Sequence, residues 1–407
     1  MTTIKDSVHD HIEVEGVASD LLDTPPVQRL RRISQLGTVK LVYPSANHTR
    51  FEHSLGVYHL ADRALDHLGI EGQQAERVQA AALLHDIGHC PYSHNIEDVL
   101  YRHTGRYHDD VGELIESGPV AQVLTDHGLN PDRIAAVISG EGQLGQIVAG
   151  ELDVDRMDYL VRDAHHTGVP YGTIDHERLV RELHFVDGEL VLDEGNVQTA
   201  ESLLLARALM NPTVYQHHVA RIAKAMLRCG VEQAIEADET DPETLQRMDD
   251  HGLHWTLRNC EATTEIARRL DERDLFKRAV WAELDPVPAD LLAADHDEIR
   301  AREREIAEEA GVDPELVILD VPEEPEMKET TSRVLVNGEV RPLEEQSTLV
   351  SALRAAQRDQ WRLGVYAPGE SSERVGNAAV RVLGLDLNGT RVRDIRTGIN
   401  ATLDEFE

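Results

Sequence analysis

The run Ala80-Ala-Ala-Leu-Leu-His85-Asp86-Ile-Gly-His89 decides the fold of this chain. Apolar residues recur at helical spacing from Val78 onward, which predicts a helix with His85 on its buried face and Asp86 at its end. An ionised carboxylate is rarely buried without a cation or several hydrogen-bond donors. Imidazole and carboxylate ligands together suit a divalent metal such as Zn, Mn, Fe or Ni. The alternative is an ordinary helix end capped near Gly88.

Two further segments offer metal ligands. In the helical pattern that begins at Arg50, His53 shares one stripe with apolar residues (Val57, Leu60, Ala64 and Leu68), which turns His53 inward. Within Glu151–Asp163, residues Asp155, Tyr159 and Asp163 lie four apart on one helical face. Such an acidic run is usually a solvated surface, but its place after two inward-facing ligand positions favours a metal ligand. The predicted ligands are His53, His85, Asp86 and Asp155.

Five motifs occur in one order: Gln28–Gly37, Tyr43–Gly56, His85–His94, Asp153–Tyr159 and Tyr215–His217. With the spacing His…His-Asp…Asp, they resemble the HD superfamily of metal-dependent phosphohydrolases. Within it they are most similar to the deoxynucleoside triphosphate triphosphohydrolases, which include bacterial dGTPases and the vertebrate enzyme with a SAM and an HD domain. The resemblance implies conversion of a dNTP to deoxynucleoside and tripolyphosphate by a homo-oligomer, a dimer or a tetramer. It implies one divalent transition metal as cofactor, and Mg²⁺ can accompany the nucleotide.

The resemblance also implies which residues act on the phosphates. It places His89 and His108 near the α-phosphate, His94 beside the scissile bond and Arg50 against the triphosphate. Histidine suits acid–base work because its pKa lies nearest neutrality. The ordinary alternative for His108 is a charged helix start. Most of the 21 histidines must have ordinary roles, and we do not select four others: His9, His11, His165 and His166.

Substrate-binding positions follow from the same resemblance. They are Gln35 and Leu36 at the sugar, Tyr159 and Asp163 as a sugar-reading pair, Arg156 and Arg207 at the triphosphate, and Tyr215 under a 2′-deoxyribose. The family carries Lys where this chain has Arg156 and His where it has Asn211, which leaves the detailed preference of the site open. The alternatives are a surface arginine for Arg156 and core aromatics for Tyr159 and Tyr215.

A regulatory site is a further implication. Asp23, Gln28 and Arg31 match positions that bind a guanine nucleotide between subunits in the SAM-bearing relative. The stretch Asp23-Thr-Pro-Pro is explained equally well as a helix N-cap with proline at the helix start.

The predicted fold is mainly α: an HD-domain helical core with small β-hairpins and a small α+β C-terminal appendage. We predict an HD phosphohydrolase domain over residues 1–285, with a hairpin at Leu183–Leu192 because Asp187-Gly188 is a type I′ turn signal. Residues 286–407 are predicted to form an acidic linker and a small α+β region. Its expected elements are a helix at Asp297–Ala310, a hairpin around Asn337-Gly338, a helix at Leu349–Arg362, a strand at Leu363–Tyr366 and a helix at Ser372–Leu383.

Charge and composition indicate the setting. The net charge of −35 comes with only five lysines, at positions 5, 40, 224, 277 and 328, which is typical of a halophile's protein. The alternative is an acidic protein of an ordinary cytoplasm. The charge argues against non-specific nucleic-acid binding, for which a basic patch would be expected. Three scattered cysteines do not form a disulfide framework, and we expect Cys90 to be a packing residue. Because we see no signal peptide and no membrane span, we expect a cytoplasmic protein.

Two other classes of function remain open at this stage. An HD-type phosphodiesterase or nucleotidase acting on another phosphoester would use the same metal ligands, but the chain lacks the His-Gly-Gly-Tyr-Pro motif of cyclic-dinucleotide HD enzymes. A non-catalytic nucleotide sensor would not need the acid–base candidates His89, His94 and His108 beside a metal. The sugar-reading positions and these histidines favour the triphosphohydrolase.

The excess of carboxylates leads to a first prediction. Because these charges repel one another, folding and activity should need salt in the molar range, which screens the repulsion. Thermal melts and activity assays across a salt series measure this. A cooperative melt with full activity in dilute buffer would contradict the halophile interpretation.

Overall fold

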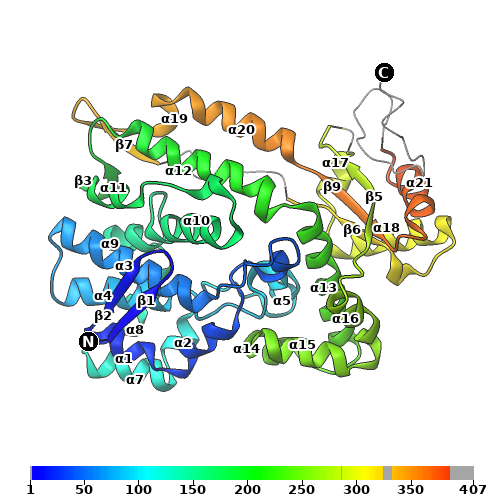
Figure 1. Cartoon of the computed structure of the whole chain (residues 1–407), viewed down its shortest axis with the longest axis horizontal. Helices are drawn as coiled ribbons and strands as arrows, with labels where there is room; N and C mark the ends of the chain where they lie inside the picture. Colours follow the sequence, from blue (N-terminus) through cyan, green and yellow to red (C-terminus); the bar gives the residue numbers. More distant parts are fainter. Residues whose placement is uncertain (1, 286, 324–331, 386–407) are drawn as a thin grey trace. The chain divides into compact units, whose positions relative to one another are not determined.

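A computed structural model describes residues 2–285, 287–323 and 332–385 (Figure 1). The fold is mainly helical with small sheets, which confirms the predicted class. The described residues form two compact units. The first unit contains residues 2–220, 227–267 and 332–353, and the second contains the remainder. The predicted domain boundary after residue 285 stays a prediction, because compactness does not test independent folding.

Helices make up most of the first unit. They are α1 (Gly16–Leu22), α2 (Pro25–Arg29), α3 (Arg50–Leu68), α4 (Gln73–Leu84), α5 (Glu97–Thr104), α6 (Gly112–Ile115), α7 (Gly118–Asp126), α8 (Pro131–Ile138), α9 (Gly142–Val148), α10 (Val154–Thr167), α11 (His176–Arg181), α12 (Val197–Met210), α14 (Pro242–Arg247), α15 (Asp250–Asn259) and α19 (Leu343–Gln346). Short 3-10 turns occur at Leu30–Arg32, Gly37–Leu41, Ser93–Asn95, Pro170–Gly172 and Glu261–Thr263. Three helices contribute residues to both units: α13 (His218–Glu236), α16 (Thr264–Asp271) and α20 (Thr348–Gln360).

Helices α3, α4 and α10 pack together and carry the predicted metal ligands. Helix α3 begins with a capping box, in which Thr49 and Glu52 satisfy each other's backbone N–H groups, and it ends at Gly69 in the left-handed conformation. The predicted stripe from His53 to Ala64 is buried. Helix α4 ends at Leu84, so His85 is its C-cap and Asp86 lies in the turn that follows, just beyond the helix end rather than at it as predicted.

The sheets of the first unit are small. Strands β3 (Leu183–Val186) and β4 (Glu189–Leu192) form the predicted hairpin, and β7 (Arg333–Val336) and β8 (Glu339–Pro342) form the second. In both turns the two central residues have positive φ, at 51° and 87° for Asp187-Gly188 and 52° and 76° for Asn337-Gly338. A parallel pairing of β4 with β7 joins the hairpins into one sheet.

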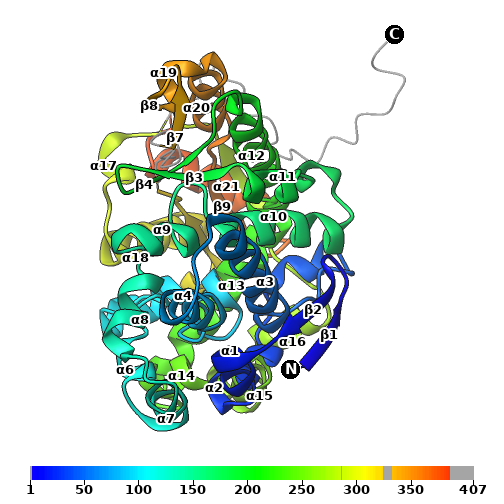
Figure 2. The same ribbon diagram turned by 90° about the vertical axis from the view of Figure 1, so that its left-hand side faces the viewer.

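An N-terminal hairpin is present that the sequence analysis missed. Strands β1 (Thr2–Asp6) and β2 (Asp10–Val14) pair antiparallel, and β2 contacts α3 (Figure 2). Its apolar face consists of the buried Ile12 and Val14 and the partly buried Ile4, so polar residues outnumber the apolar ones that would reveal a strand.

The second unit has its own core. Strands β5 (Lys277–Ala282), β9 (Leu363–Ala367) and β6 (Ile318–Asp320) form an antiparallel sheet in the order β5-β9-β6. Its helices are α17 (Ala289–Leu292), α18 (His296–Ala310) and α21 (Ser372–Val382), with a 3-10 turn at Pro314–Leu316. The predicted tail helices and the strand β9 are therefore confirmed to within a few residues. In the described part of the chain, every helix is too short or too polar to cross a membrane.

The close approach of α3 to α10 leads to a stability prediction. A Cβ atom at Gly56 would overlap Asp158 Oδ1 and press on Arg162, both of which are buried. Gly56→Ala should therefore destabilise the protein by about 1–3 kcal/mol, the cost of overpacking a filled core. Denaturant unfolding measures the change. As a control, Gly252→Ala in α15 adds a Cβ at ordinary contact distance and should be neutral or slightly stabilising. Equal stability of the two variants would contradict the packing described.

Candidate metal centre and active site

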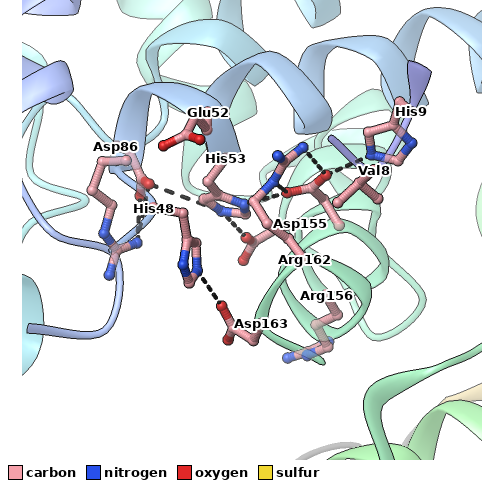
Figure 3. Close-up of polar contacts among 12 residues, drawn as sticks. Val8, His9, His48, Glu52, His53, Asp86, Asp155, Arg156, Arg162 and Asp163 are labelled. Atoms are coloured by element: carbon pink, nitrogen blue, oxygen red, sulfur yellow. Dashed lines mark hydrogen bonds and ion pairs between the residues drawn. The ribbon is translucent and has the colours of Figure 1, made fainter. Parts of the chain in front are cut away.

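The four predicted metal ligands meet at one place. His53 comes from α3, His85 and Asp86 follow α4, and Asp155 lies in the first turn of α10. Figure 3 shows His53, Asp86 and Asp155. His53 Nε2 lies 2.8 Å from Asp155 Oδ1, 3.4 Å from His85 Nε2 and 3.9 Å from Asp86 Oδ2. His85 Nε2 lies 3.3 Å from Asp86 Oδ1. Ligand atoms bonded to one metal at about 2.1 Å lie roughly 3–3.5 Å apart. The spacing and the donor types therefore fit a divalent ion.

The charges of this group also favour a cation. Burial opposes the charge on Asp86, yet the guanidinium of Arg50 and the nearby imidazoles hold the pKa of that carboxyl well below its usual range. Burial likewise disfavours charge on His53, but its hydrogen bonds with Asp155 and Asp158 raise its pKa to about 10. The neighbouring aspartates thus stabilise the protonated, positively charged form of His53. A metal ion bound here would displace the proton between His53 and Asp155.

Second-layer contacts fix the ligands in place. The buried carboxylate of Asp158, one turn after Asp155 on α10, accepts a hydrogen bond from His53 Nδ1 at 2.8 Å. This bond keeps the proton on Nδ1 and turns the lone pair of Nε2 toward the metal group. Arg50 donates to both oxygens of Asp86 at 3.0 and 3.2 Å and to Ser93 Oγ at 2.9 Å. Arg50, predicted as a triphosphate contact, is therefore buried against a metal ligand in the structure.

The three acid–base candidates form a second cluster beside the first. The rings of His89 and His108 stack at 4.1 Å, and His94 lies edge-on to both, at 4.7 and 4.9 Å. His89 Nε2 is 3.2 Å from Asp86 Oδ1, which connects the two clusters. His108 is held in this cluster rather than serving only as a charged helix start.

Glu97 binds two of these histidines and was missed in the sequence. Its Oε2 lies 2.7 Å from His94 Nδ1, and its Oε1 lies 2.5 Å from His108 Nδ1. Burial opposes charge on His108, but the bond to Glu97 raises its pKa. The contact places the His94 proton on Nδ1, so Nε2 carries the lone pair on a side chain that is 54% exposed. The spacing of three residues between His94 and Glu97 at the start of a helix was the available signal.

Tyr159, Asp163 and Tyr215 are brought together, as the resemblance implied. The Tyr215 hydroxyl donates to Asp163 Oδ2 at 2.8 Å, and its ring lies 6.3 Å from that of Tyr159 in a T-shaped arrangement. A π-helical turn over Asn211–Tyr215 after α12 positions Tyr215. His48, which lies in the quoted motif Tyr43–Gly56 but was not selected, also binds Asp163, with Nε2 2.8 Å from Oδ1.

The other predicted substrate-binding residues, Arg156, Arg207, Gln35 and Leu36, lie in different environments. Arg207 lies on α12, and its charge, with that of Arg156, acts on Tyr159, whose pKa burial nevertheless raises to about 12. Arg156 also pairs with Asp153 at 3.3 Å and donates to the Gly150 carbonyl. Gln35 is buried and Leu36 is partly buried against the core. The structure therefore does not single out these two residues as substrate contacts.

The three candidate regulatory residues lie close together. Arg31 Nε donates to Gln28 Oε1 at 2.9 Å, and Asp23 is near enough to stabilise the charge on Arg31. Gln28 also donates to the Leu22 carbonyl. Thr24 is the N-cap of α2 and Pro25 its first residue, which confirms the interpretation of this stretch as a helix N-cap with proline at the helix start; Asp23 itself is the C-cap of α1. A regulatory nucleotide remains a proposal.

Comparisons with known proteins place the fold and this site in the HD-domain family. A family model described as the HD domain matches residues 50–163, and one described as the HD associated region matches residues 174–394, more than half of the chain. The chain therefore belongs to the HD-domain family that carries this associated region and is similar to dNTP triphosphohydrolases. A solved structure of a hypothetical protein from Aquifex aeolicus superposes with a TM-score of 0.75 at 28% identity, covering 93% of this chain and 99% of that one. A phosphohydrolase from Bacteroides thetaiotaomicron superposes with a TM-score of 0.72 at 25% identity, covering 90% and 100%.

Sequence relatives agree with this placement. An uncharacterized protein from Methanocaldococcus jannaschii is 33% identical over 91% of this chain and 80% of its own length. Human deoxynucleoside triphosphate triphosphohydrolase SAMHD1 is 29% identical over 68% of this chain and 54% of its own length. Its homolog from Dictyostelium discoideum is 29% identical over 67% and 59%. The chain thus spans little more than half the length of these two enzymes.

The metal group leads to a direct prediction. His85→Ala and Asp86→Ala each remove one of four ligands, so each variant should retain little divalent metal and lose nearly all hydrolytic turnover. Elemental analysis of gel-filtered protein measures the bound metal. His165→Ala, an exposed histidine on α10, serves as the control and should keep the full metal content. Wild-type metal content in either ligand variant would place the metal elsewhere.

Proposed function

We propose that this protein is a metal-dependent dNTP triphosphohydrolase that converts a dNTP to a deoxynucleoside and tripolyphosphate. The observation that carries the proposal is the common face of α10. Asp155 belongs to the metal group, and Asp163, eight residues further on, binds Tyr215. Eight residues of helix span about 12 Å. A substrate that meets both groups is extended, with phosphate at one end and a hydroxyl-bearing group at the other, as a nucleotide is.

The sugar end is served by Tyr159, Asp163 and Tyr215. Asp163 can accept a hydrogen bond from the 3′-hydroxyl of a sugar, while His48 and Tyr215 hold its carboxylate in place. The Tyr215 ring would lie under a 2′-deoxyribose and exclude the additional 2′-hydroxyl of a ribose by contact. Discrimination by exclusion needs a fixed ring, and the hydrogen bond to Asp163 fixes it.

The phosphate end is served by cationic side chains. The charges of Arg156 and Arg207 both act on Tyr159, and they would offset the charge of a bound triphosphate. A bound divalent ion would lower the pKa of a water molecule and polarise a phosphate oxygen. Attack of water on the α-phosphorus would break the bond from phosphorus to the nucleoside oxygen, which would leave the triphosphate intact and the nucleoside oxygen in need of a proton.

Proton transfer to the leaving nucleoside oxygen is assigned to the histidine cluster. Burial lowers the pKa of His94, and the hydrogen bond from Nδ1 to Glu97 opposes that shift, so Glu97 would stabilise the imidazolium whose Nε2 proton the leaving oxygen takes up. His108, whose pKa is raised by Glu97, supplies positive charge near the α-phosphate. His89 is buried, and this burial, followed by the charge of Arg50, lowers its pKa well below the usual range, so it acts as a neutral donor.

Product analysis tests the reaction. Incubation with each dNTP should release tripolyphosphate and deoxynucleoside, separated by ion-exchange chromatography. His94→Ala should keep its metal but lose rate by about 10²–10⁴-fold, the usual effect of a lost acid–base group. His103→Ala, an exposed histidine on α5, is the matched control and should retain full rate. Release of pyrophosphate or orthophosphate instead would move the protein to the phosphodiesterase or nucleotidase class.

Sugar selection gives a separate test. Tyr215→Ala should raise kcat/KM for ribonucleotides relative to deoxyribonucleotides, because the ring that excludes the 2′-hydroxyl is gone. Competition between a dNTP and the matching NTP measures the ratio. Tyr171→Ala, a tyrosine that is 47% exposed, should leave the ratio unchanged. An unchanged ratio in Tyr215→Ala would mean that Tyr215 is only a core aromatic.

A further inference from the structure

The carboxylate of Asp158 joins three segments of the chain. It is fully buried and lies on α10, one turn beyond the metal-ligand position Asp155. Its Oδ2 accepts from His53 Nδ1 at 2.8 Å and from Arg162 Nε at 2.9 Å. Its Oδ1 accepts from Arg162 Nη2 at 3.0 Å and lies 2.6 Å from Nε2 of His9. The contact with His9 links sequence positions 149 residues apart.

His9 is delivered by the turn of the N-terminal hairpin. Asp6 Oδ1 accepts from the backbone N–H groups of Val8 and His9 at 2.9 and 2.8 Å, which fixes the turn. Asp6 Oδ2 accepts from Arg162 Nη1 at 2.8 Å, so the turn is tied to α10 as well. The side chain of His9 is 1% exposed. Figure 3 shows His9 and Val8 on one side of His53 and Asp86 on the other.

Neighbouring rings hold the imidazole of His9 against Asp158. Its centroid lies 5.0 Å from that of His59 and 5.3 Å from that of His176. Burial and the proximity of His9 together lower the pKa of His59 to about 4, so His59 is neutral at pH 7. His11, two residues along the same hairpin, is in contrast 58% exposed and lies 3.2 Å from Asp10.

We propose that His9 is a positioning residue for the metal ligand His53 and acts through Asp158. Asp158 can hold His53 in one tautomer and one orientation only if the carboxylate itself cannot rotate. His9 binds Oδ1, the oxygen that His53 does not contact, and Arg162 donates to both oxygens. Without His9, one buried oxygen loses a donor and the carboxylate gains room to turn, so His53 Nε2 is presented less well to the metal. The inference rests on the metal centre of the proposed function.

The test compares two substitutions of similar size. His9→Gln keeps a side-chain donor, and His9→Leu removes it; His11→Leu is the control on the same hairpin. Competition with a chelator measures the affinity for Zn²⁺ or Mn²⁺ alone, without nucleotide. His9→Leu should bind metal about 10–100-fold more weakly, the usual effect of losing an outer-layer partner. His9→Gln should recover most of that affinity, and His11→Leu should match the wild type.

Thermal unfolding of the metal-free variants distinguishes a loss of metal positioning from a loss of folding. His9→Ala replaces His9→Leu if the leucine variant lacks a cooperative melt. Wild-type metal affinity in a folded variant without the donor would overturn the proposal, as would equal losses in the leucine and glutamine variants. If the wild type binds metal but hydrolyses no dNTP, the proposed function fails, and the metal affinities of the variants still decide the role of His9. If the wild type binds no metal, both fail.

Discussion

The structure depends on burying a carboxylate, Asp158, where α3 crosses α10. A buried carboxylate is costly unless donors surround it, and here His53, His9 and Arg162 satisfy it. The crossing can be this close because Gly56 leaves room for Asp158. The hydrogen bond between Asp158 and His53 Nδ1 also orients His53. This one bond therefore helps to satisfy the buried charge and presents His53 to the metal group.

The helical repeat of α10 determines which of its side chains face the site. Asp155 faces the metal group, Asp158 supports it from behind, and Tyr159 and Asp163 continue along the helix toward Tyr215. Side chains three or four residues apart share a face, so one helix distributes ligand, support and recognition residues over a few turns. The second histidine cluster lies next to this group, since His89 contacts Asp86. In the proposed reaction, one rigid helix would hold the phosphate end and the sugar end of the substrate apart.

Most of the correct predictions came from local sequence patterns. The apolar period that ends at Leu84 placed His85 and Asp86 at a helix end, and the Asp187-Gly188 turn signal located a hairpin. His9 could not be found this way, because its contact with Asp158 is distant in sequence and its hairpin has few apolar residues. The role of a buried carboxylate such as Asp158 likewise depends on which donors the fold brings to it, and the helical spacing alone does not specify them.

Anomalous diffraction at a metal absorption edge, from crystals of the wild-type protein, tests the central claim most directly. In the described part of the chain, two side-chain groups could hold a metal: His53 with His85 and Asp86, and His89 with His94, Glu97 and His108. We expect one anomalous peak within bonding distance of His53, His85, Asp86 and Asp155, with Asp158 still bound to His53 Nδ1. A peak only in the second group, or none in metal-supplemented crystals, would contradict it.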